Sequence, residues 1–329
     1  MSNKILQVKE VKKHFEISNK IPFLKNKDSV KAVDNVSFEV NKGETLGIVG
    51  ESGCGKSTVA RLVSQIISPT SGDIIYEDYN LNKLTKKEQK EIRRSIQMVF
   101  QDPYSTLNPR KKIGDLISEH LIVHNIGDKK ERRQVVENLL ETVGINKRFY
   151  DRFPHEFSGG QRQRINIARA LALNPSLVIC DEPVSALDVS IQAQVLNLLK
   201  NLQKEFDLTY IFISHDLNVV RYICDRIAVM YLGKIVEIGT YQEIYDKPKH
   251  PYTKALLSSI PKENPFDSIE RIPLKGNVPS PINPPSGCSF HERCPFAIDI
   301  CKVREPQLYS DDDNHLAACH VVNNKEELV

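Results

Sequence analysis

One glycine-rich loop constrains the fold of this chain more than any other feature. Residues 50–57 read Gly-Glu-Ser-Gly-Cys-Gly-Lys-Ser, which matches the pattern G-x-x-x-x-G-K-[ST]. The apolar run 44–50 predicts a buried strand before the loop, and apolar residues at helical spacing from Val59 to Ile67 predict a helix after it. In such a loop between a strand and a helix, the backbone N–H groups converge on one position and, with the helix N-terminus, bind phosphate. We therefore expect an α/β fold built around a nucleotide site.

The side chains of this loop predict the contacts of ATP and its Mg²⁺ ion. Lys56 is expected to bind the β- and γ-phosphates, and Ser57 to coordinate Mg²⁺. The other residues expected to contact the nucleotide are Gly50, Ser52, Gly53, Cys54, Gly55 and Thr58. Cys54 occupies a variable position of the pattern. We interpret it as filler, with a thiol open to alkylation when the nucleotide is absent.

Two adjacent acids follow a second apolar run, Leu177–Cys180, which predicts another buried strand. A carboxylate at the end of such a strand can hold the Mg²⁺ shell, and we assign this role to Asp181. The next acid can orient or deprotonate an attacking water, which we assign to Glu182. Alone, the pair fits a solvated acidic turn equally well. The phosphate loop favours the catalytic interpretation.

The charge balance restricts the class of partner. The chain of 329 residues carries 45 basic and 42 acidic side chains, a net charge of +3, so we expect no nucleic-acid partner. No run approaches the ~18 apolar residues that a membrane helix needs. Residues 1–15 lack the apolar core of a signal peptide. We expect a cytosolic chain that reaches a membrane only through other subunits.

Strand and helix patterns alternate from about residue 30 to 240 and predict an α/β domain with a largely buried sheet. A third buried strand is expected at Tyr210–Ile213, and a hairpin at Ile227–Ile238 turning near Gly233 and Lys234. Residues 110–150 are rich in Leu, Ile, Glu, Lys and Arg and predict a helical insertion. Seven prolines between 261 and 285 predict a linker.

A further motif resembles a known family. Residues 157–164 read Phe-Ser-Gly-Gly-Gln-Arg-Gln-Arg, which is similar to the LSGGQ signature of ABC ATPases, with Phe157 where leucine is usual. The resemblance implies that this loop contacts the γ-phosphate of ATP bound to an opposite subunit, through Ser158 and Gly160. Two chains would then enclose two nucleotides, and one chain alone would not complete a site.

The other elements of that family follow in order. Gln101 resembles the glutamine that senses the metal, as a Mg²⁺ ligand, and couples to the membrane subunits. Ser185–Asp188 resembles the loop that lines the dimer seam, and His215 resembles the switch histidine that contacts the γ-phosphate. Phe15 is the best match for the aromatic residue that stacks on adenine; a core position is the alternative. The resemblance implies catalytic roles for Glu182, His215 and Gln101.

Several segments resemble one subfamily, the oligopeptide/dipeptide importer ATPases (OppF/DppF-like). They are an insertion at about 18–29, Gln101–Arg110, His250–Leu257 and a cysteine-containing tail. These segments separate the peptide, nickel and glutathione members of the subfamily poorly. The implied fold is a P-loop NTPase of the ABC type at 1–260, with an inserted helical subdomain at about 105–165. A small C-terminal extension would occupy 261–329.

The subfamily resemblance also implies partners and a location. Two transmembrane permease subunits, a second homologous ATPase forming a heterodimer, and an extracytoplasmic substrate-binding protein are expected. The chain would lie on the cytoplasmic side of the cell membrane as a peripheral subunit. The helical insertion would receive a short helix from a permease.

Four of the seven cysteines lie in the tail, at Cys288, Cys294, Cys301 and Cys319. Four thiolates suit either zinc or a [4Fe–4S] cluster, and free cysteines are the third interpretation. The spacing has no C-x-x-C pair, which disfavours zinc, and it departs from the ferredoxin run as well. The subfamily resemblance favours a structural [4Fe–4S] cluster. His291, His315 and His320 nearby are interpreted as surface residues.

The alternative functions are those of a soluble ABC protein, of a subunit that does not hydrolyse ATP, and of an exporter. A soluble ABC protein acting on ribosomes or DNA usually carries two ATP modules or a long coiled coil, and this chain has neither. A subunit that binds ATP without turnover is disfavoured by Glu182 and His215. Exporters commonly fuse the ATPase to membrane helices, which are absent here. A peptide importer ATPase is the function that we expect.

Overall fold

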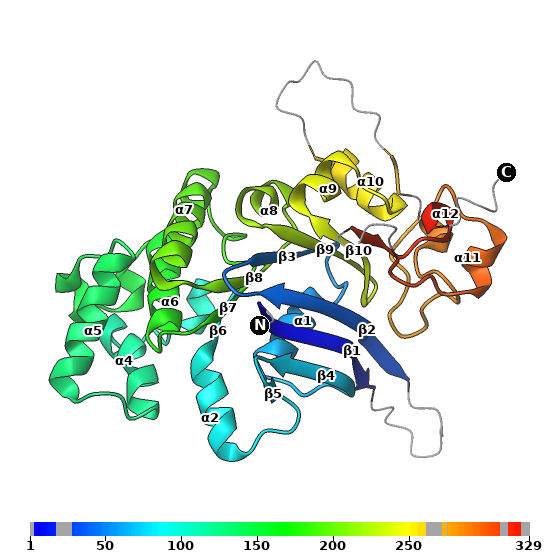
Figure 1. Ribbon diagram of the computed structural model, residues 1–329. Coiled ribbons are helices and arrows are strands. Elements are labelled where there is room, and N and C mark those ends of the chain that lie inside the picture. Colours follow the sequence, from blue (N-terminus) through cyan, green and yellow to red (C-terminus); the bar gives the residue numbers. More distant parts are fainter. Residues whose placement is uncertain (1–2, 18–27, 261–271, 275, 310–314, 324–329) are drawn as a thin grey trace. The chain divides into compact units, whose positions relative to one another are not determined.

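The computed structural model describes residues 3–17, 28–260, 272–274, 276–309 and 315–323 (Figure 1). Most of the insertion expected at 18–29, and Pro261 and Pro265 of the expected linker, lie outside the described residues. The chain divides into two compact units. Unit 1 comprises residues 1–40, 46–82 and 214–329, and unit 2 comprises residues 41–45 and 83–213.

Unit 1 contains an antiparallel sheet in the order β2-β1-β4-β5. Its strands are β1 (Lys4–Glu16), β2 (Ser29–Asn41), β4 (Ser71–Tyr76) and β5 (Tyr79–Asn80). In the β1–β4 pair, Leu6 lies opposite Tyr76 and Val8 opposite Ile74, and all four side chains are buried. Strand β1 is not among the strands predicted from the sequence. Lysines and glutamates interrupt its apolar residues, so the segment lacks the continuous apolar run of a central strand.

A second group of strands in unit 1 carries the phosphate loop. Strand β3 (Thr45–Val49) pairs in parallel with β9 (Arg226–Tyr231), which forms an antiparallel hairpin with β10 (Lys234–Thr240). The predicted strand and hairpin are therefore confirmed. The turn lies at Leu232 and Gly233, one residue earlier than expected, with φ of 44° and 80°. Strand β11 (Leu316–Ala317), from the tail, pairs with β10.

The first helix after the loop, α1, spans Lys56–Val63. The expected continuation to Ile67 is wrong. Gln65 adopts a left-handed conformation with φ of 57°, which ends the helix, and Ile66 is 52% exposed. The apolar spacing of Ile66 therefore does not reflect packing in a helix.

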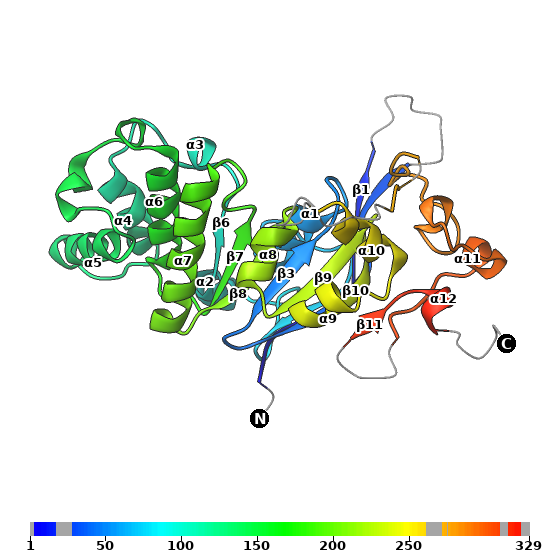
Figure 2. The same ribbon diagram turned by 90° about the horizontal axis from the view of Figure 1, so that it is seen from above.

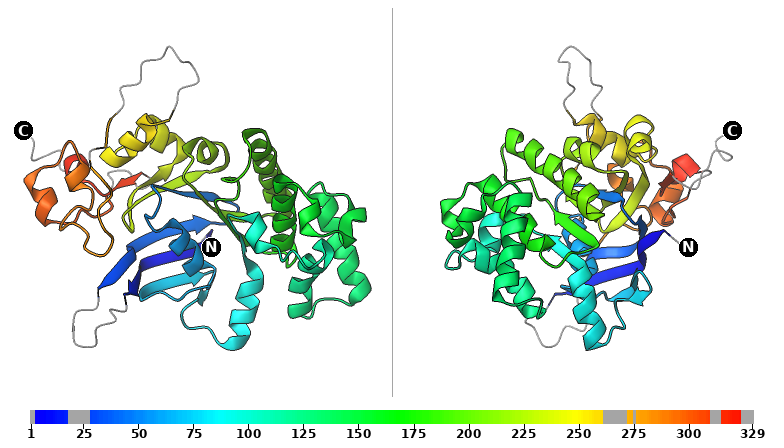
Figure 3. Two further views of the ribbon diagram at one scale, coloured as in Figure 1. Left: turned by 180° about the vertical axis from the view of Figure 1, so that it is seen from behind. Right: turned by 60° about the vertical axis from the view of Figure 1, so that its left-hand side comes forward.

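The rest of unit 1 is helical or irregular. Its helices are α8 (Leu217–Ile223), α9 (Tyr241–Asp246), α10 (Pro251–Ser258), η3 (His291–Arg293), α11 (Asp299–Val303) and α12 (His320–Asn323). The orange tail lies beside the yellow helix α10 in both orientations (Figures 1 and 3). Phe290 of the tail contacts Tyr252 of α10, and the centroids of the two rings are 5.4 Å apart.

Unit 2 combines a parallel sheet with a group of helices. Strands β6 (Ile96–Val99), β7 (Leu177–Asp181) and β8 (Thr209–Ser214) pair in parallel, with Val99 opposite Cys180 and Cys180 opposite Phe212. The expected strands at 177–180 and 210–213 are thus confirmed. Their side chains are fully buried, as expected for a parallel sheet.

The helices of unit 2 are α2 (Lys86–Ser95), α3 (Pro103–Thr106), α4 (Ile113–Val123), α5 (Lys129–Thr142), η1 (Lys147–Asp151), η2 (Pro154–Glu156), α6 (Gly159–Leu171) and α7 (Val189–Phe206). Helices α4, α5 and α6 pack on one another (Figure 2). The helical character predicted for residues 110–150 is confirmed. Buried residues of α4 and α5, such as Ile117, Val136 and Leu140, form its core.

A fully buried carboxylate joins β10 to the segments that follow it in unit 1. Glu237 is 0% exposed and accepts the backbone N–H groups of Lys249 at 2.7 Å and His250 at 2.9 Å. Its Oε1 also lies 2.7 Å from Nε2 of His315 in the tail. A buried charge is tolerated only when such partners replace water.

We expect Glu237→Ala to lower the free energy of unfolding by about 3 kcal/mol, because it leaves buried donors without an acceptor. Thermal unfolding followed by circular dichroism measures this loss. Glu39→Ala is the matched control, because Glu39 forms an exposed ion pair with Lys4 at 2.6 Å and its loss costs less than ~1 kcal/mol. Equal losses in the two variants would contradict the structural role of Glu237.

Candidate nucleotide-binding site

The phosphate loop in unit 1 joins the end of β3 to the start of α1. Gly50, Gly53 and Gly55 have φ of 151°, 79° and 107°, which side chains rarely allow. The Lys56 side chain is 5% exposed and folds back over the loop. Its Nζ donates to the backbone oxygens of Gly50 at 2.7 Å and Glu51 at 2.9 Å. The lysine is therefore held in the concavity where phosphates bind in such loops.

Two of these glycines are required by space as well as by conformation. A Cβ on Gly50 would lie 2.1 Å from the carbonyl oxygen of Met230, and one on Gly55 would lie 2.1 Å from that of Ala32. Both obstacles are backbone atoms and have little freedom to move. The loop therefore has no room for a side chain at Gly50, beside Met230 of β9, or at Gly55, beside Ala32 of β2.

Cys54 faces the inside of this loop. Its side chain is 3% exposed, and burial raises the pKa of the thiol. A protonated, covered thiol reacts slowly with alkylating reagents. The expected alkylation of Cys54 is therefore wrong, because the thiol packs under Gly50 rather than facing solvent.

In unit 2 the structure brings together two of the residues predicted to be catalytic. Nε2 of Gln101 donates to Oε2 of Glu182 at 2.8 Å. Glu182 directly follows β7, where it adopts φ of 47°, and its N–H donates to the carbonyl of Ile213 at 3.0 Å. Left-handed backbone at a non-glycine residue is strained and is often found at functional positions. Asp181, the preceding residue, is 6% exposed.

The signature segment forms the start of helix α6. Ser158 is the N-cap: its Oγ accepts the N–H of Gln161, whose side chain in turn accepts the N–H of Ser158. Gly160 packs against α7, where a Cβ would lie 2.4 Å from Cγ2 of Ile191. Phe157 is buried edge-on against Phe149, with ring centroids 5.9 Å apart. At this helix N-terminus Ser158 is exposed and Gly160 is buried.

The remaining predicted residues occupy more open positions. Phe15 is 41% exposed near the end of β1, with the Lys13 ammonium 5.2 Å from its ring centroid, so the core alternative does not describe it. Ser57 and Thr58 lie in the first turn of α1. His215 lies in the bend between β8 and α8 and is exposed.

The tail brings its four cysteines close to one another. The N–H of Cys288 donates to the carbonyl of Cys301 at 2.8 Å. Burial, and to a smaller extent the neighbouring Cys301, Cys319 and Cys294, raise the pKa of Cys288 to about 11. Burial likewise raises the pKa of Cys294 and Cys319. In the described part of the chain, however, no group of three or more Cys, His, Asp or Glu is arranged to hold a metal ion.

The interpretation of His315 as a surface residue is wrong. It is 5% exposed, because β11 carries it onto β10 beside the buried Glu237. Sequence reasoning also missed Glu51 of the loop and Arg293 of the tail, which pair at 2.8 Å. The two residues are 242 positions apart, and no local pattern marks such a contact.

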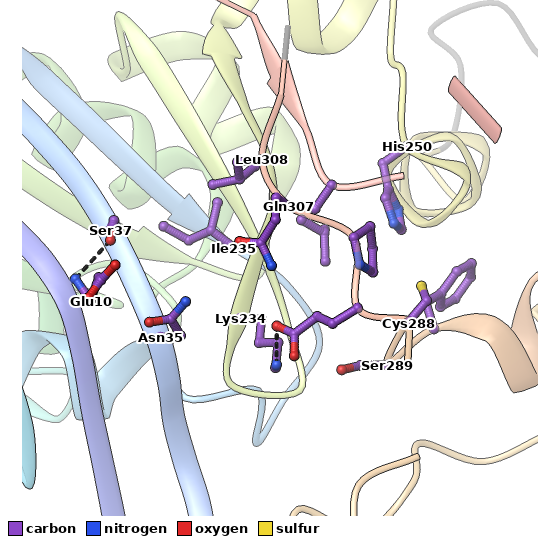
Figure 4. A pocket seen from close by; sticks show the side chains of 15 residues that line it. Glu10, Asn35, Ser37, Lys234, Ile235, His250, Cys288, Ser289, Gln307 and Leu308 are labelled. Carbon is purple, nitrogen blue, oxygen red and sulfur yellow. Dashed lines mark hydrogen bonds and ion pairs between the residues drawn. The ribbon is translucent and has the colours of Figure 1, made fainter. Parts of the chain in front are cut away.

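A cavity of about 180 Å³ lies within unit 1, and Cys288 is one of the residues that line it. Figure 4 shows Glu10, Asn35 and Ser37 on one side of it and Cys288, Ser289 and His250 on the other. Lys234 lies between the two sides and forms an ion pair with Glu305. Among the described helices, none has the length and apolar character needed to cross a bilayer.

The comparisons with known proteins agree with this geometry. Residues 33–185 match the family model described as ABC transporter, and residues 236–301 match the oligopeptide/dipeptide transporter C-terminal region. The dimeric ATP-binding cassette MJ0796 bound to ADP and Pi superposes with a TM-score of 0.63 at 31% identity, covering 72% of this chain and 98% of that chain. The structure of CbiO1 from Clostridium perfringens superposes with a TM-score of 0.64 at 29% identity, covering 75% of this chain and 92% of that chain. The fold is that of an ABC nucleotide-binding domain, a P-loop NTPase.

Relatives of similar length show to which family of ABC transporter proteins the chain belongs. The chain is 55% identical over 320 residues to the oligopeptide transport ATP-binding protein AppF of Bacillus subtilis, covering 96% of this chain and 97% of that protein. It is 50% identical over 322 residues to the dipeptide transport ATP-binding protein DppF of Escherichia coli, covering 98% and 96%. The chain belongs to the oligopeptide/dipeptide family of ABC transporter ATP-binding proteins.

We expect Gly55→Ala to weaken ATP binding more than tenfold, because the new methyl group would displace the loop from the Ala32 carbonyl. Titration with a fluorescent ATP analogue measures the affinity. Gly43→Ala is the matched control: Gly43 also has a positive φ, 76°, but a Cβ there meets nothing within 4 Å. This control is expected to cost ~1 kcal/mol of stability and to leave the affinity unchanged. Equal affinities in both variants would refute the steric argument.

Proposed function

We propose that this chain is the ATP-hydrolysing subunit of an ABC importer that takes up oligopeptides or dipeptides across the cytoplasmic membrane. The observation that carries the ATPase part is the 2.8 Å hydrogen bond from Gln101 to Glu182, in a chain whose phosphate loop retains Lys56. The peptide substrate is supported by relatives named as oligopeptide and dipeptide transport ATP-binding proteins.

In the proposed reaction, Lys56 and the N–H groups of the loop bind the phosphates of ATP. Mg²⁺, when bound, neutralises phosphate charge, and the oxygens of Ser57, Asp181 and Gln101 are the donors that it prefers. Glu182 orients the attacking water and accepts its proton. The amide of Gln101 holds the Glu182 carboxylate in place. His215 contacts the γ-phosphate, and Phe15 stacks on the adenine.

We further propose that two ATPase chains act together. Ser158 and Gly160 present the N-terminus of α6 to ATP bound by the other chain. The dimeric MJ0796 cassette supports this arrangement. The partner is a second, homologous ATPase. ATP binding closes the dimer and hydrolysis reopens it.

The proposed complex also contains two transmembrane permeases and an extracytoplasmic substrate-binding protein. The chain is a peripheral subunit on the cytoplasmic side of the membrane. The helical part of unit 2, which includes α3, α4 and α5, receives a helix of a permease. The ABC fold and the family membership support these partners.

We expect Glu182→Gln to reduce ATP hydrolysis at least 100-fold while ATP still binds, because the amide cannot accept a proton from water. Phosphate release from the assembled transporter measures hydrolysis, and size-exclusion chromatography detects the trapped ATP-bound dimer. Glu205→Gln, at an exposed position of α7, is the control and should hydrolyse normally. Normal turnover in Glu182→Gln would disprove the assignment of the base.

We propose that Cys288, Cys294, Cys301 and Cys319 hold a structural [4Fe–4S] cluster. A single zinc ion needs all four sulfurs at ≈ 2.3 Å, whereas in a four-iron cluster each thiolate binds a different iron and the sulfurs stay farther apart. The gathering of these four cysteines in the tail, the backbone hydrogen bond from Cys288 to Cys301 and the resemblance to the subfamily support this proposal.

Anaerobically purified protein is expected to be brown, with a broad visible absorbance from thiolate-bound iron. Cys294→Ser with Cys301→Ser should remove this absorbance and the bound iron, measured by elemental analysis. Cys180→Ser is the control, because Cys180 lies in β7 outside the tail. A colourless protein that contains zinc would overturn the cluster.

A further inference from the structure

One ion pair connects the cysteine-containing tail to the phosphate loop. Arg293, which directly precedes Cys294, is 8% exposed and directs its guanidinium at Glu51, the second residue of the loop. The two bonds are Nη1 to Oε2 at 2.8 Å and Nη2 to Oε1 at 3.1 Å. This two-pronged geometry is the strongest that an arginine–carboxylate pair forms. The pair also raises the pKa of Arg293, which therefore stays charged.

Residues of α10, α1 and the tail hold Glu51 at several atoms. Its N–H donates to the hydroxyl of Tyr252 at 2.9 Å, its carbonyl accepts from Lys56 at 2.9 Å, and Arg293 binds its carboxylate. The rings of Tyr231, Tyr252 and Phe290 pack beside the pair, with centroids 4.7 to 5.4 Å apart. These rings lower the local dielectric constant and strengthen the ion pair, in which the Arg293 side chain is 7% exposed and the Glu51 side chain 25% exposed.

The backbone around Arg293 is bounded by two of the four cysteines. The N–H of His291 donates to the carbonyl of Cys288 at 3.1 Å, and the N–H of Cys294 donates to the carbonyl of His291 at 3.3 Å. Helix η3 (His291–Arg293) therefore lies between Cys288 and Cys294 in one hydrogen-bonded turn. Whatever fixes these two thiols also fixes the position of Arg293.

We propose that Arg293 is a positioning residue for ATP binding, and that it transmits the state of the four-cysteine tail to the phosphate loop. It does so through Glu51. Without Arg293, a carboxylate in the loop stands unpaired close to the phosphates of ATP and repels them. With Arg293 in place, this charge is neutralised and the loop backbone is fixed. This role requires ATP binding alone and does not depend on which group the cysteines bind.

The first test is a double-mutant cycle in the full-length chain, read out as the affinity for Mg-ATP. Arg293→Met keeps the length of the side chain, removes its charge and should weaken binding about tenfold. In a Glu51→Gln background no carboxylate remains to be unpaired, so the same substitution should change the affinity less than about twofold. Arg304→Met, at an exposed position of the tail, is the control and should bind normally.

Two results would overturn the positioning role. One is an equal loss of affinity from Arg293→Met in both backgrounds, which would mean that the arginine does not act through Glu51. The other is normal ATP affinity in Arg293→Met together with a lower melting temperature, which would indicate a purely structural pair. Arg293→Lys keeps the charge and should recover part of the affinity.

The second test concerns transmission from the cysteines. Cys288→Ser with Cys294→Ser should weaken ATP binding several-fold when Arg293 is present and should have no further effect in Arg293→Met. Unchanged affinity in the first case, or an equal loss in both cases, would disprove transmission. If the double serine variant does not fold, Cys294→Ser alone is measured by the same comparison. Loss of iron or colour without loss of ATP affinity would disprove transmission and leave the proposed cluster standing.

Discussion

The nucleotide site depends on how closely the phosphate loop approaches its neighbouring strands. The carbonyl oxygens of Met230 and Ala32 lie where the Cβ atoms of Gly50 and Gly55 would be. A chain with side chains at these positions would be pushed out of the concavity, and its N–H groups would lose their common direction. The left-handed backbone of the loop and the buried position of Lys56 both follow from this close approach.

Long-range polar contacts then fix the loop from the C-terminal part of unit 1. Glu237 holds the N–H of His250, and Nδ1 of His250 accepts the N–H of Tyr252 at 3.1 Å. Burial lowers the pKa of His250 to about 4, so the ring is neutral and able to accept this bond at physiological pH. Tyr252 in turn accepts the N–H of Glu51. A chain of buried contacts thus runs from β10 to the loop, and Arg293 joins it from the tail.

In unit 2, the residues proposed to be catalytic lie at the ends of buried parallel strands. Strand β7 is buried along its length, and its last residue, Asp181, and the next residue, Glu182, place two carboxylates at its C-terminal end. The left-handed turn at Glu182 redirects the chain, and Gln101, two residues after β6, supplies the amide that holds the carboxylate. Neighbouring parallel strands end at the same edge of a sheet, which brings two distant motifs together.

Local sequence patterns sufficed to identify the phosphate loop, the buried strands β3, β7 and β8, and the family of the chain. These features are local, because glycines, apolar runs and short motifs can be recognised within about ten residues. Long-range packing, in contrast, buries Cys54 and His315, places β1 in an antiparallel sheet, and pairs Arg293 with Glu51. The physical reason is that burial and ion pairing depend on which segments pack together. Partners as far apart as Glu51 and Arg293 leave no pattern in the residues around either one.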